Sequence, residues 1–343
     1  MSAKAVARAW AGDGSLPELV SVVVGLYIIN LALHALVFSS RNPRIRPRAQ
    51  NALLTACRLL FGVPVNVLLG AWLTFWILLW ELVRTPLWKP RAVRRVPDDQ
   101  ASVAMCGGGF RTWYHLGVYW GLHDALGAEA LRNVKFSGAS IGALVAAVAA
   151  AEVHPADIWA HIPAIAEAYR GDLLGHITEV GQFCRYLLHT TLPADAHARV
   201  EGRLWISISS LFPVPHNHMQ SAFASRDDLI DAVIAAQYIP TWTHPGVCVH
   251  NGMVCVDGGV TNNLPALSST SLKIGLDTDD IASWDADLVP SEPLSRVNTF
   301  IPADERNLQR MLLCGKDDAR RWLRTKRGRA FARRAAENGG ADE

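Results

Sequence analysis

The stretch 133–151, NVKFSGASIGALVAAVAAA, constrains the fold of this 343-residue chain more than any other part of it. It opens with strand-type residues and continues, from residue 143, as an apolar run that suits a buried helix. Between them lies Ser140, two residues from Gly138 and two from Gly142. A serine on a tight strand-to-helix turn between glycines is the pattern of a nucleophile elbow. A plain small-residue turn that packs a helix closely on a sheet would use the same residues. Other motifs are therefore needed to distinguish a nucleophile elbow from such a turn.

A second glycine motif, GGGFR at 107–111, follows a predicted buried strand at 102–106. Three successive glycines ahead of a helix form a backbone nest whose N–H groups can point at an anion. A nucleotide-binding loop is disfavoured because no G-x-G-x-x-G or G-K-[ST] pattern follows. One helix and one strand separate this loop from Ser140, so both loops should meet at one edge of a parallel sheet. We expect the amides of Gly107, Gly108 and Gly109 to form an oxyanion hole.

A serine nucleophile needs a group that accepts its proton. The last histidine of the chain, His250, precedes an Asn-Gly hairpin turn, so no triad in the order Ser, Asp, His can use a later acid. An acid between Ser140 and His250 could still orient a histidine. Asp257 follows a short predicted strand and precedes Gly258 and Gly259, which leave room for a substrate. It is either the direct base of a Ser–Asp dyad, with a pKa raised by burial, or part of a plain Asp-Gly turn.

Taken together, the motifs at 107–111, 138–142 and 257–259 resemble those of the patatin-like phospholipase family, over residues 101–270. Within it the chain is most similar to the adipose triglyceride lipase branch, on the stretches 114–118, 192–195, 202–204, 238–240 and 263–265. The resemblance implies a three-layer α/β/α fold with a mainly parallel central sheet, lipid ester substrates, and neither metal nor other cofactor. It also implies that Ser140 and Asp257 are catalytic, with an oxyanion hole at 107–109.

Four glycines flank the two expected catalytic residues and leave space around them: Gly138 and Gly142 on either side of Ser140, and Gly258 and Gly259 after Asp257. Arg111 either buttresses the glycine loop or steers anionic head groups. Thr112 stands where the family usually has a further glycine, and about a hundred residues precede the matching region. The far end of the loop and the route of the substrate are therefore expected to differ from the family pattern.

Two apolar runs precede the motifs. Residues 19–38 contain no Asp, Glu, Lys or Arg, and their length matches about 30 Å of hydrocarbon. In residues 59–83, Glu81 is the only Asp, Glu, Lys or Arg. Three tryptophans in this run recur at helical spacing, and the stripe that they form fits either a membrane face or a core face. An arginine-rich segment follows each run, and both such segments prefer the cytosolic side. We expect the first run to be an uncleaved anchor and the second a monotopic hairpin or interfacial helix.

The chain is therefore expected to divide into a membrane-associated helical region (1–98), a patatin-like catalytic domain (99–272) and a C-terminal extension (273–343). The extension ends in a basic helical tail that suits either a membrane surface or solvent. A net charge of +2 is too small for long-range electrostatic attraction of a charged partner. No sequence motif for nucleic-acid recognition is present. Six cysteines without paired spacing favour a reducing cytosolic environment for the catalytic part.

These features predict a lipid acyl hydrolase at the endoplasmic reticulum membrane or the lipid-droplet surface, with its catalytic domain in the cytosol. Its substrates would be acylglycerol or phospholipid esters. A transacylase would use the same residues with an alcohol in place of water. A catalytically inactive, membrane-tethered lipid-binding protein is the non-enzymatic alternative, which the presence of Ser140 and Asp257 disfavours. Nothing in the sequence identifies a protein co-activator.

Overall fold

The computed structural model describes residues 95–172, 176, 179–210, 216–239, 242–243, 248–277 and 285–337. These residues all belong to one compact unit, residues 90–343. The apolar runs 19–38 and 59–83, and the membrane-associated region expected around them, lie outside the described residues. Within the described ranges, no helix combines the length and the apolar character needed to cross a bilayer.

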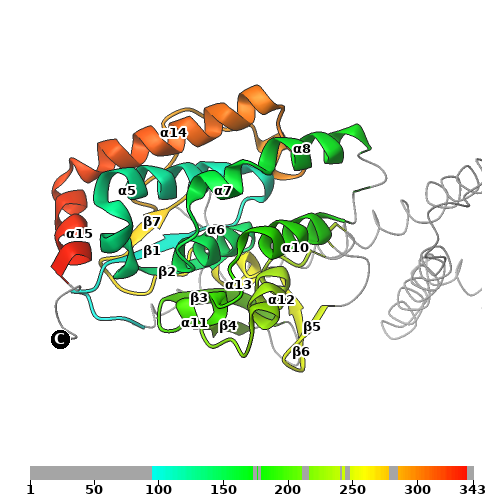
Figure 1. The fold of residues 1–343 in the computed structure, drawn as a ribbon, viewed down its shortest axis with the longest axis horizontal. Coiled ribbons are helices and arrows are strands. Elements are labelled where there is room, and N and C mark those ends of the chain that lie inside the picture. Colours follow the sequence, from blue (N-terminus) through cyan, green and yellow to red (C-terminus); the bar gives the residue numbers. More distant parts are fainter. Residues whose placement is uncertain are drawn as a thin grey trace, which may run out of the picture. The chain divides into compact units, whose positions relative to one another are not determined.

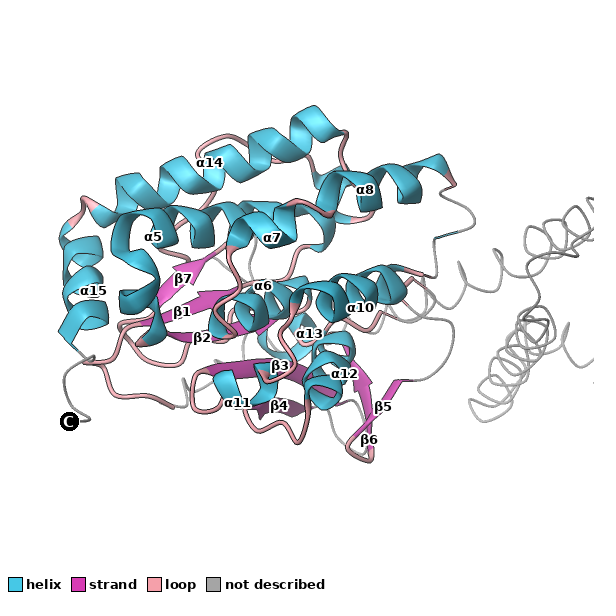
Figure 2. Ribbon diagram, viewed as in Figure 1, coloured by secondary structure: helices cyan, strands magenta, loops and turns pink. Residues whose placement is uncertain are grey.

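A seven-stranded sheet forms the centre of this unit, with helices packed against it (Figures 1 and 2). Its order is β5-β6-β3-β2-β1-β7, and β4 also pairs with β3. The pairings among β7, β1, β2 and β3 are parallel, whereas those of β3 with β4 and β6, and of β5 with β6, are antiparallel. The α/β class is confirmed, but the described sheet is mixed rather than mainly parallel, because antiparallel strands extend the parallel core. The strands are β1 (Ser102–Met105), β2 (Lys135–Ala139), β3 (Leu204–Ser210), β4 (His216–Gln220), β5 (Cys248–His250), β6 (Met253–Val256) and β7 (Leu272–Ile274).

Helices alternate with strands along the first half of the described chain, as the sequence pattern predicts. The turn helices are η2 (Gly109–Thr112) and η3 (Arg296–Thr299). The α-helices are α5 (Trp113–Arg132), α6 (Ile141–Ala150), α7 (Pro155–Trp159), α8 (Ile162–Gly171), α10 (Val180–Thr191), α11 (Ala196–Arg199), α12 (Arg226–Ala236), α13 (Gly259–Asn262), α14 (Glu305–Leu323) and α15 (Lys326–Glu337). Ser225 caps α12, since its side chain accepts a hydrogen bond from Asp228 N.

Two neighbouring residues of β2 show how the faces of the sheet are covered. Phe136 packs edge-on against Tyr119 of α5, with ring centroids 6.3 Å apart. Ser137 points to the opposite face and donates a hydrogen bond to Pro265 O at 2.7 Å. One face therefore carries α5, whereas the segment after α13 covers the other. We expected helical layers on both faces, but in the described residues the second face is covered at this point by extended chain.

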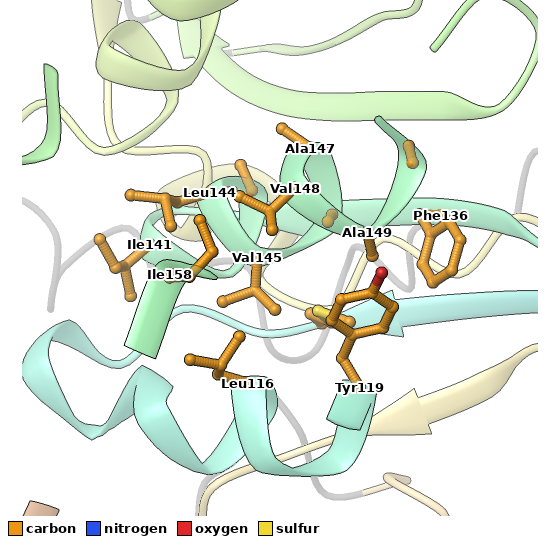
Figure 3. Packing of buried hydrophobic residues seen from close by; sticks show 14 of the residues in the cluster. Leu116, Tyr119, Phe136, Ile141, Leu144, Val145, Ala147, Val148, Ala149 and Ile158 are labelled. Atoms are coloured by element: carbon orange, nitrogen blue, oxygen red, sulfur yellow. The ribbon is translucent and has the colours of Figure 1, made fainter. Parts of the chain in front are cut away.

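The core lies between β2 and the two helices α5 and α6 (Figure 3). Every residue of α6 is buried, and most of them are alanine or valine. Such small side chains let the helix axis approach the sheet closely, and apolar burial stabilises the contact by about 25 cal/mol per Å². Leu116 and Tyr119 of α5 and Val145 of α6 are buried side by side in this layer. The helix that begins after Ser140 is thus completely buried in the core.

The C-terminal helix α14 lies along α5 (Figure 1). The two backbones come so close that a Cβ on Gly117 would lie 2.1 Å from Leu312 O, and one on Gly315 would lie 2.2 Å from Tyr114 O. The Tyr114 hydroxyl also donates a hydrogen bond to Asp318 at 3.1 Å. Residues beyond 272 therefore pack into the same core as the motifs, and the boundary expected at 272 falls within β7.

The basic tail does not present its large apolar residues to the surface. Trp322 and Phe331 are buried against each other between α14 and α15, with ring centroids 5.4 Å apart. Its cations also form ion pairs, as Arg320 does with Asp124 at 3.0 Å. Of the two roles that the sequence left open for the tail, membrane binding is disfavoured, because helix packing uses the aromatic side chains that a bilayer would need. The alternative, a charged helix with a solvated face, describes the tail better.

Candidate active site

Ser140 connects β2 to α6 in the backbone conformation that an elbow requires. Its φ is 52° and its ψ is −137°, a positive-φ conformation that a non-glycine residue rarely adopts. A Cβ on Gly138 would lie 2.4 Å from Gly142 O, and one on Gly142 would lie 2.4 Å from Cys106 O. Both flanking positions therefore exclude any side chain, because the turn is packed against its own helix and against the end of β1.

The structure brings Ser140 and Asp257 into direct contact. Ser140 Oγ donates a hydrogen bond to Asp257 Oδ2 at 2.5 Å, and both residues are only 8% exposed. The other carboxylate oxygen, Oδ1, accepts a hydrogen bond from Gly259 N at 2.7 Å. Asp257 N in turn donates to Tyr238 O at 2.8 Å, just after the end of α12. The strand ends of β2 and β6 thus hold a hydroxyl and a carboxylate in one fixed pair.

Burial changes the acid–base character of this carboxylate. It raises the pKa of Asp257 to about 6, against the lowering effect of the hydrogen bonds from Ser140 and Gly259. At neutral pH the group is still mostly ionised, yet it holds a proton more strongly than a solvated aspartate does. A base with these properties is better matched to accepting a hydroxyl proton near pH 7.

No histidine in the described ranges forms a hydrogen bond with Ser140 or Asp257. His250 is buried at the end of β5, where its Nε2 and Gln220 Oε1 lie 2.7 Å apart. His244 lies outside the described residues. The geometry therefore favours the direct Ser–Asp pair over the histidine-containing alternative that the sequence left open.

The glycine loop at 107–109 lies next to the serine, but its three amides are not equivalent. A Cβ on Gly107 would lie 2.6 Å from the Cβ of Ser140, so the loop touches the elbow itself. The amide of Gly107 donates a hydrogen bond to Asn263 Oδ1 at 3.0 Å and is therefore already committed. The expectation that Gly107 N faces an oxyanion is corrected. Among described residues, the amides of Gly108 and Gly109 have no such acceptor, and the first turn of α6 leaves further N–H groups free.

Arg111 is buried behind this loop. Its Nη1 lies 2.6 Å from Asp277 Oδ2, which follows β7, and the arginine side chain is only 9% exposed. An anionic head group would have to displace this carboxylate to reach the guanidinium. Of the two roles expected for Arg111, the geometry favours the buttress over the head-group contact.

Two residues near the site, Asn263 and His115, have no role that the sequence pattern assigned. His115 Nε2 donates to Cys106 O at 2.9 Å and so holds the end of β1 just ahead of the glycine loop. Burial lowers the pKa of His115 to about 4, which keeps the ring neutral. Both residues lie in the stretches that carry the family resemblance, but only the folded chain brings Asn263 to Gly107.

An apolar pocket opens at the serine. Apart from Ser140 itself, its wall comes mainly from η2, α8 and α10 and from Gln237, Trp242 and Thr243 after α12. The apolar lining includes Phe110, Trp113, Ile141, Ile162, Ile165, Val180, Phe183, Leu187 and Trp242. Such a wall fits a hydrocarbon chain far better than a charged ligand. Metal-binding groups of three or more His, Cys, Asp or Glu side chains are absent from the described ranges.

The fold and the site together define an α/β protein in which an elbow serine faces a buried carboxylate beside an apolar pocket. Comparison with known sequences places this arrangement in a family: residues 103–269 match the patatin-like phospholipase profile. Human patatin-like phospholipase domain-containing protein 4 is 30% identical over 246 residues, which cover 65% of this chain and 95% of that protein. The chain belongs to the patatin-like phospholipase family, as the motif resemblance predicted.

Other relatives are longer than the region they share with this chain. Rat patatin-like phospholipase domain-containing protein 2 is 29% identical over 223 residues, which cover 62% of this chain and 46% of that protein. Human omega-hydroxyceramide transacylase is 26% identical over 172 residues, covering 49% of this chain and 32% of its own length. The family therefore includes proteins named for acyl hydrolysis and for acyl transfer, and this chain spans less than half of these two longer relatives.

Proposed function

We propose that this protein is a lipid acyl hydrolase that cleaves acylglycerol or phospholipid esters with a Ser140–Asp257 dyad. The observation that carries the proposal is the 2.5 Å hydrogen bond between the elbow serine and the buried carboxylate. The pocket beside Ser140 supplies an apolar wall for an acyl chain. Membership of the patatin-like phospholipase family supports lipid ester chemistry.

In the proposed first step, Ser140 Oγ attacks the ester carbonyl while Asp257 Oδ2 accepts the hydroxyl proton. The tetrahedral oxyanion is stabilised by the free amides of Gly108 and Gly109 and by the amide of Ile141 at the start of α6. The positive end of the α6 dipole adds to this stabilisation. Asp257 then returns the proton to the leaving alcohol, and an acyl group remains on Ser140.

In the second step water attacks the acyl-enzyme while Asp257 accepts its proton, and this proton returns to Ser140 Oγ as the Oγ–acyl bond breaks and the fatty acid leaves. An alcohol in place of water would give acyl transfer, which is the activity named for the omega-hydroxyceramide transacylase relative. The two outcomes use the same dyad and differ only in the acceptor. Hydrolysis is our first proposal, and the product analysis below distinguishes it from transfer.

The test is lipid extraction after incubation of the full chain with mixed triacylglycerol and phospholipid vesicles. Wild-type protein is expected to release free fatty acid, and Ser140→Ala and Asp257→Asn protein to release none above background. A fluorophosphonate probe should label Ser140 in the wild type only. Fatty acid release by the Ser140→Ala protein would refute the dyad, and new acylated alcohols without free fatty acid would favour the transacylase. A protein that neither labels nor turns over lipid would match the inactive lipid-binding alternative.

The location of the enzyme belongs to the same proposal. The runs 19–38 and 59–83 would attach the protein to the endoplasmic reticulum or to lipid droplets, with the catalytic part in the cytosol. Protease protection of tags placed at residue 45 and at the C-terminus tests this arrangement. Equal accessibility of both tags is expected, whereas opposite accessibilities would show that the second run crosses the membrane.

A further inference from the structure

Two large apolar side chains project into solvent beside the active site. Val297 and Phe300 are 63% and 57% exposed. They are three residues apart on the turn formed by η3 and Phe300, so they lie on the same side of it. We call residues 297–300 the apolar turn. Exposed apolar side chains are unfavourably solvated. Where they form part of a larger apolar surface, that surface is typically a binding site for a protein, a membrane or a ligand.

The apolar turn continues into the pocket at Ser140. The ring of Phe300 lies 5.3 Å from that of Trp242, and Trp242 lies 6.2 Å from Phe110. Trp242 and Phe110 both line the pocket. An unbroken row of aromatic side chains therefore leads from solvent to the serine.

The apolar turn is also fixed to the catalytic loop. A Cβ on Gly109 would lie 1.8 Å from Thr299 O, so the two backbones are in contact. A molecule that touches Val297 and Phe300 therefore sits at a set position relative to the free amides of the glycine loop. This coupling is what a docking surface for substrate needs, because Ser140 itself is almost completely buried.

The charge beside the apolar turn suits a phospholipid surface. Arg296 is exposed, and it forms no ion pair with any residue that the structure describes. A cation next to exposed aromatic and aliphatic groups is the combination found where proteins bind anionic bilayers. The tail offers no comparable apolar group, because Trp322 and Phe331 are buried.

We propose that the apolar turn is the surface through which the catalytic domain docks on a lipid layer, with Trp242 guiding the ester from that layer to Ser140. This inference rests on the proposed lipid ester activity and adds the partner surface and the entry route. Val297 and Phe300 enter the layer, and Arg296 contacts the head groups. The lipid moves along a continuous apolar path and never has to cross water.

The experiment compares two double variants of the full chain. Val297→Glu/Phe300→Glu places charges on the apolar turn. Val249→Glu/Val254→Glu is the matched control, because these valines are also exposed, pair across β5 and β6, and do not line the pocket. Each protein is assayed on phospholipid vesicles and on a soluble short-chain ester, which needs no docking.

The turn variant should lose at least about tenfold more kcat/KM on vesicles than on the soluble ester. The hairpin control should keep both activities. Equal losses of the turn variant on both substrates would show that the turn only supports the fold. A loss of vesicle activity in the hairpin control alone would show that the docking surface lies on β5 and β6 instead, which would overturn the inference. Wild-type activity of the turn variant on vesicles would overturn the inference.

A second measurement needs no turnover, so it separates failure of docking from failure of the proposed activity. Ser140→Ala protein is subjected to hydroxyl-radical footprinting with vesicles of phosphatidylcholine alone or mixed with phosphatidylserine. Phe300 and Trp242 should be protected only when vesicles are present, and Arg296→Gln should remove the extra protection given by phosphatidylserine. Protection of Phe300 without vesicles would mean that residues 1–94 or a second copy cover the turn, which would contradict the proposal.

Discussion

Asn263 Oδ1 accepts the amide hydrogen of Gly107 at 3.0 Å, and this bond joins the loop after Asp257 to the glycine loop. A Cβ on Gly259 would lie 2.7 Å from the same oxygen, so the amide side chain fills the space between the two loops. One side chain therefore sets how far the acid–base residue lies from the free amides of Gly108 and Gly109. Asn263 acts on the reaction through position.

Asn263→Ala should lower kcat by about 10- to 100-fold, because small displacements of a reacting group cost this much. Asn262→Ala is the control, since the side chain of Asn262 donates to Asn217 Oδ1 at 3.4 Å and makes no described hydrogen bond to the glycine loop. Asn263→Asp keeps the acceptor but adds a negative charge near Asp257, which should raise the pKa of that carboxyl and move the acidic limb of the pH profile upward. Equal losses of kcat in the Asn263→Ala and Asn262→Ala proteins would contradict a positioning role for Asn263. Rates on a soluble ester against pH check both effects.

The pKa of Asp257, raised by burial to about 6, predicts the pH dependence of activity. Only the ionised carboxylate can accept the proton of Ser140, so kcat/KM should fall about tenfold per pH unit below this value. The acidic limb of the profile gives the apparent pKa of this carboxyl in the folded enzyme. A profile that stays flat down to pH 5 would contradict Asp257 as the base.

The same shift predicts an effect on stability with a definite sign. Between the ordinary pKa of 3.8 and about 6, folded Asp257 keeps a proton that the unfolded chain has released. Its burial therefore costs stability as the pH rises through this range, and the cost is fully present above pH 6. Asp257→Asn should raise the free energy of unfolding at pH 7.5 by about 3 kcal/mol and lose this gain near pH 4. Urea unfolding at the two pH values measures it, and an unchanged or lower stability at pH 7.5 would contradict the prediction.

Gly142→Ala should destabilise the protein by about 1–3 kcal/mol or more, because the new methyl group meets backbone that cannot move aside. The added Cβ would lie 2.4 Å from Cys106 O and 2.7 Å from Met105 O. Gly171→Ala is the matched control, since nothing lies within 4 Å of its added Cβ. Thermal unfolding of both variants gives the comparison, and equal melting temperatures would refute the packing argument.

Arg111→Met should lower both stability and activity, because it leaves Asp277 without its buried cation. Removing one partner of a buried pair typically costs about 3–5 kcal/mol, while replacing both is often much less harmful. Arg111→Met/Asp277→Leu should therefore recover much of the loss in melting temperature. The activity loss should be equal on anionic and neutral lipids. A loss confined to anionic substrates would instead show that Arg111 contacts head groups.

Much of the site was predictable because its signals are local. The residues around Ser140 specify a strand, a strained turn and a small-residue helix, and Ser225 specifies the start of α12, from neighbours within a few positions. The contact of Ser140 with Asp257 was a hypothesis that the three motifs and their family resemblance together made specific. The bond from Gly107 to Asn263 was not predictable, because it joins residues 156 positions apart and no pattern distinguishes an asparagine that bonds a loop from one in a turn.

The tail shows a second limit of sequence patterns. A basic helix with a few aromatic residues has the same periodicity whether Trp322 enters a bilayer or packs on Phe331. The expectation of a mainly parallel sheet had a similar limit, because the antiparallel pairing of β6 with β3 depends on which strand the β5–β6 hairpin joins. The burial of Trp322 and the pairing of β6 depend on tertiary contacts, which local sequence patterns do not specify.

The edge strand β7 and Asp277 lie beyond residue 269, where the match to the family profile ends. Truncation at that point would remove β7, which pairs with β1. It would also remove Asp277 and leave the buried guanidinium of Arg111 without its described ion-pair partner. Recombinant fragments intended for enzymology should accordingly run at least through Glu337, the last residue of α15.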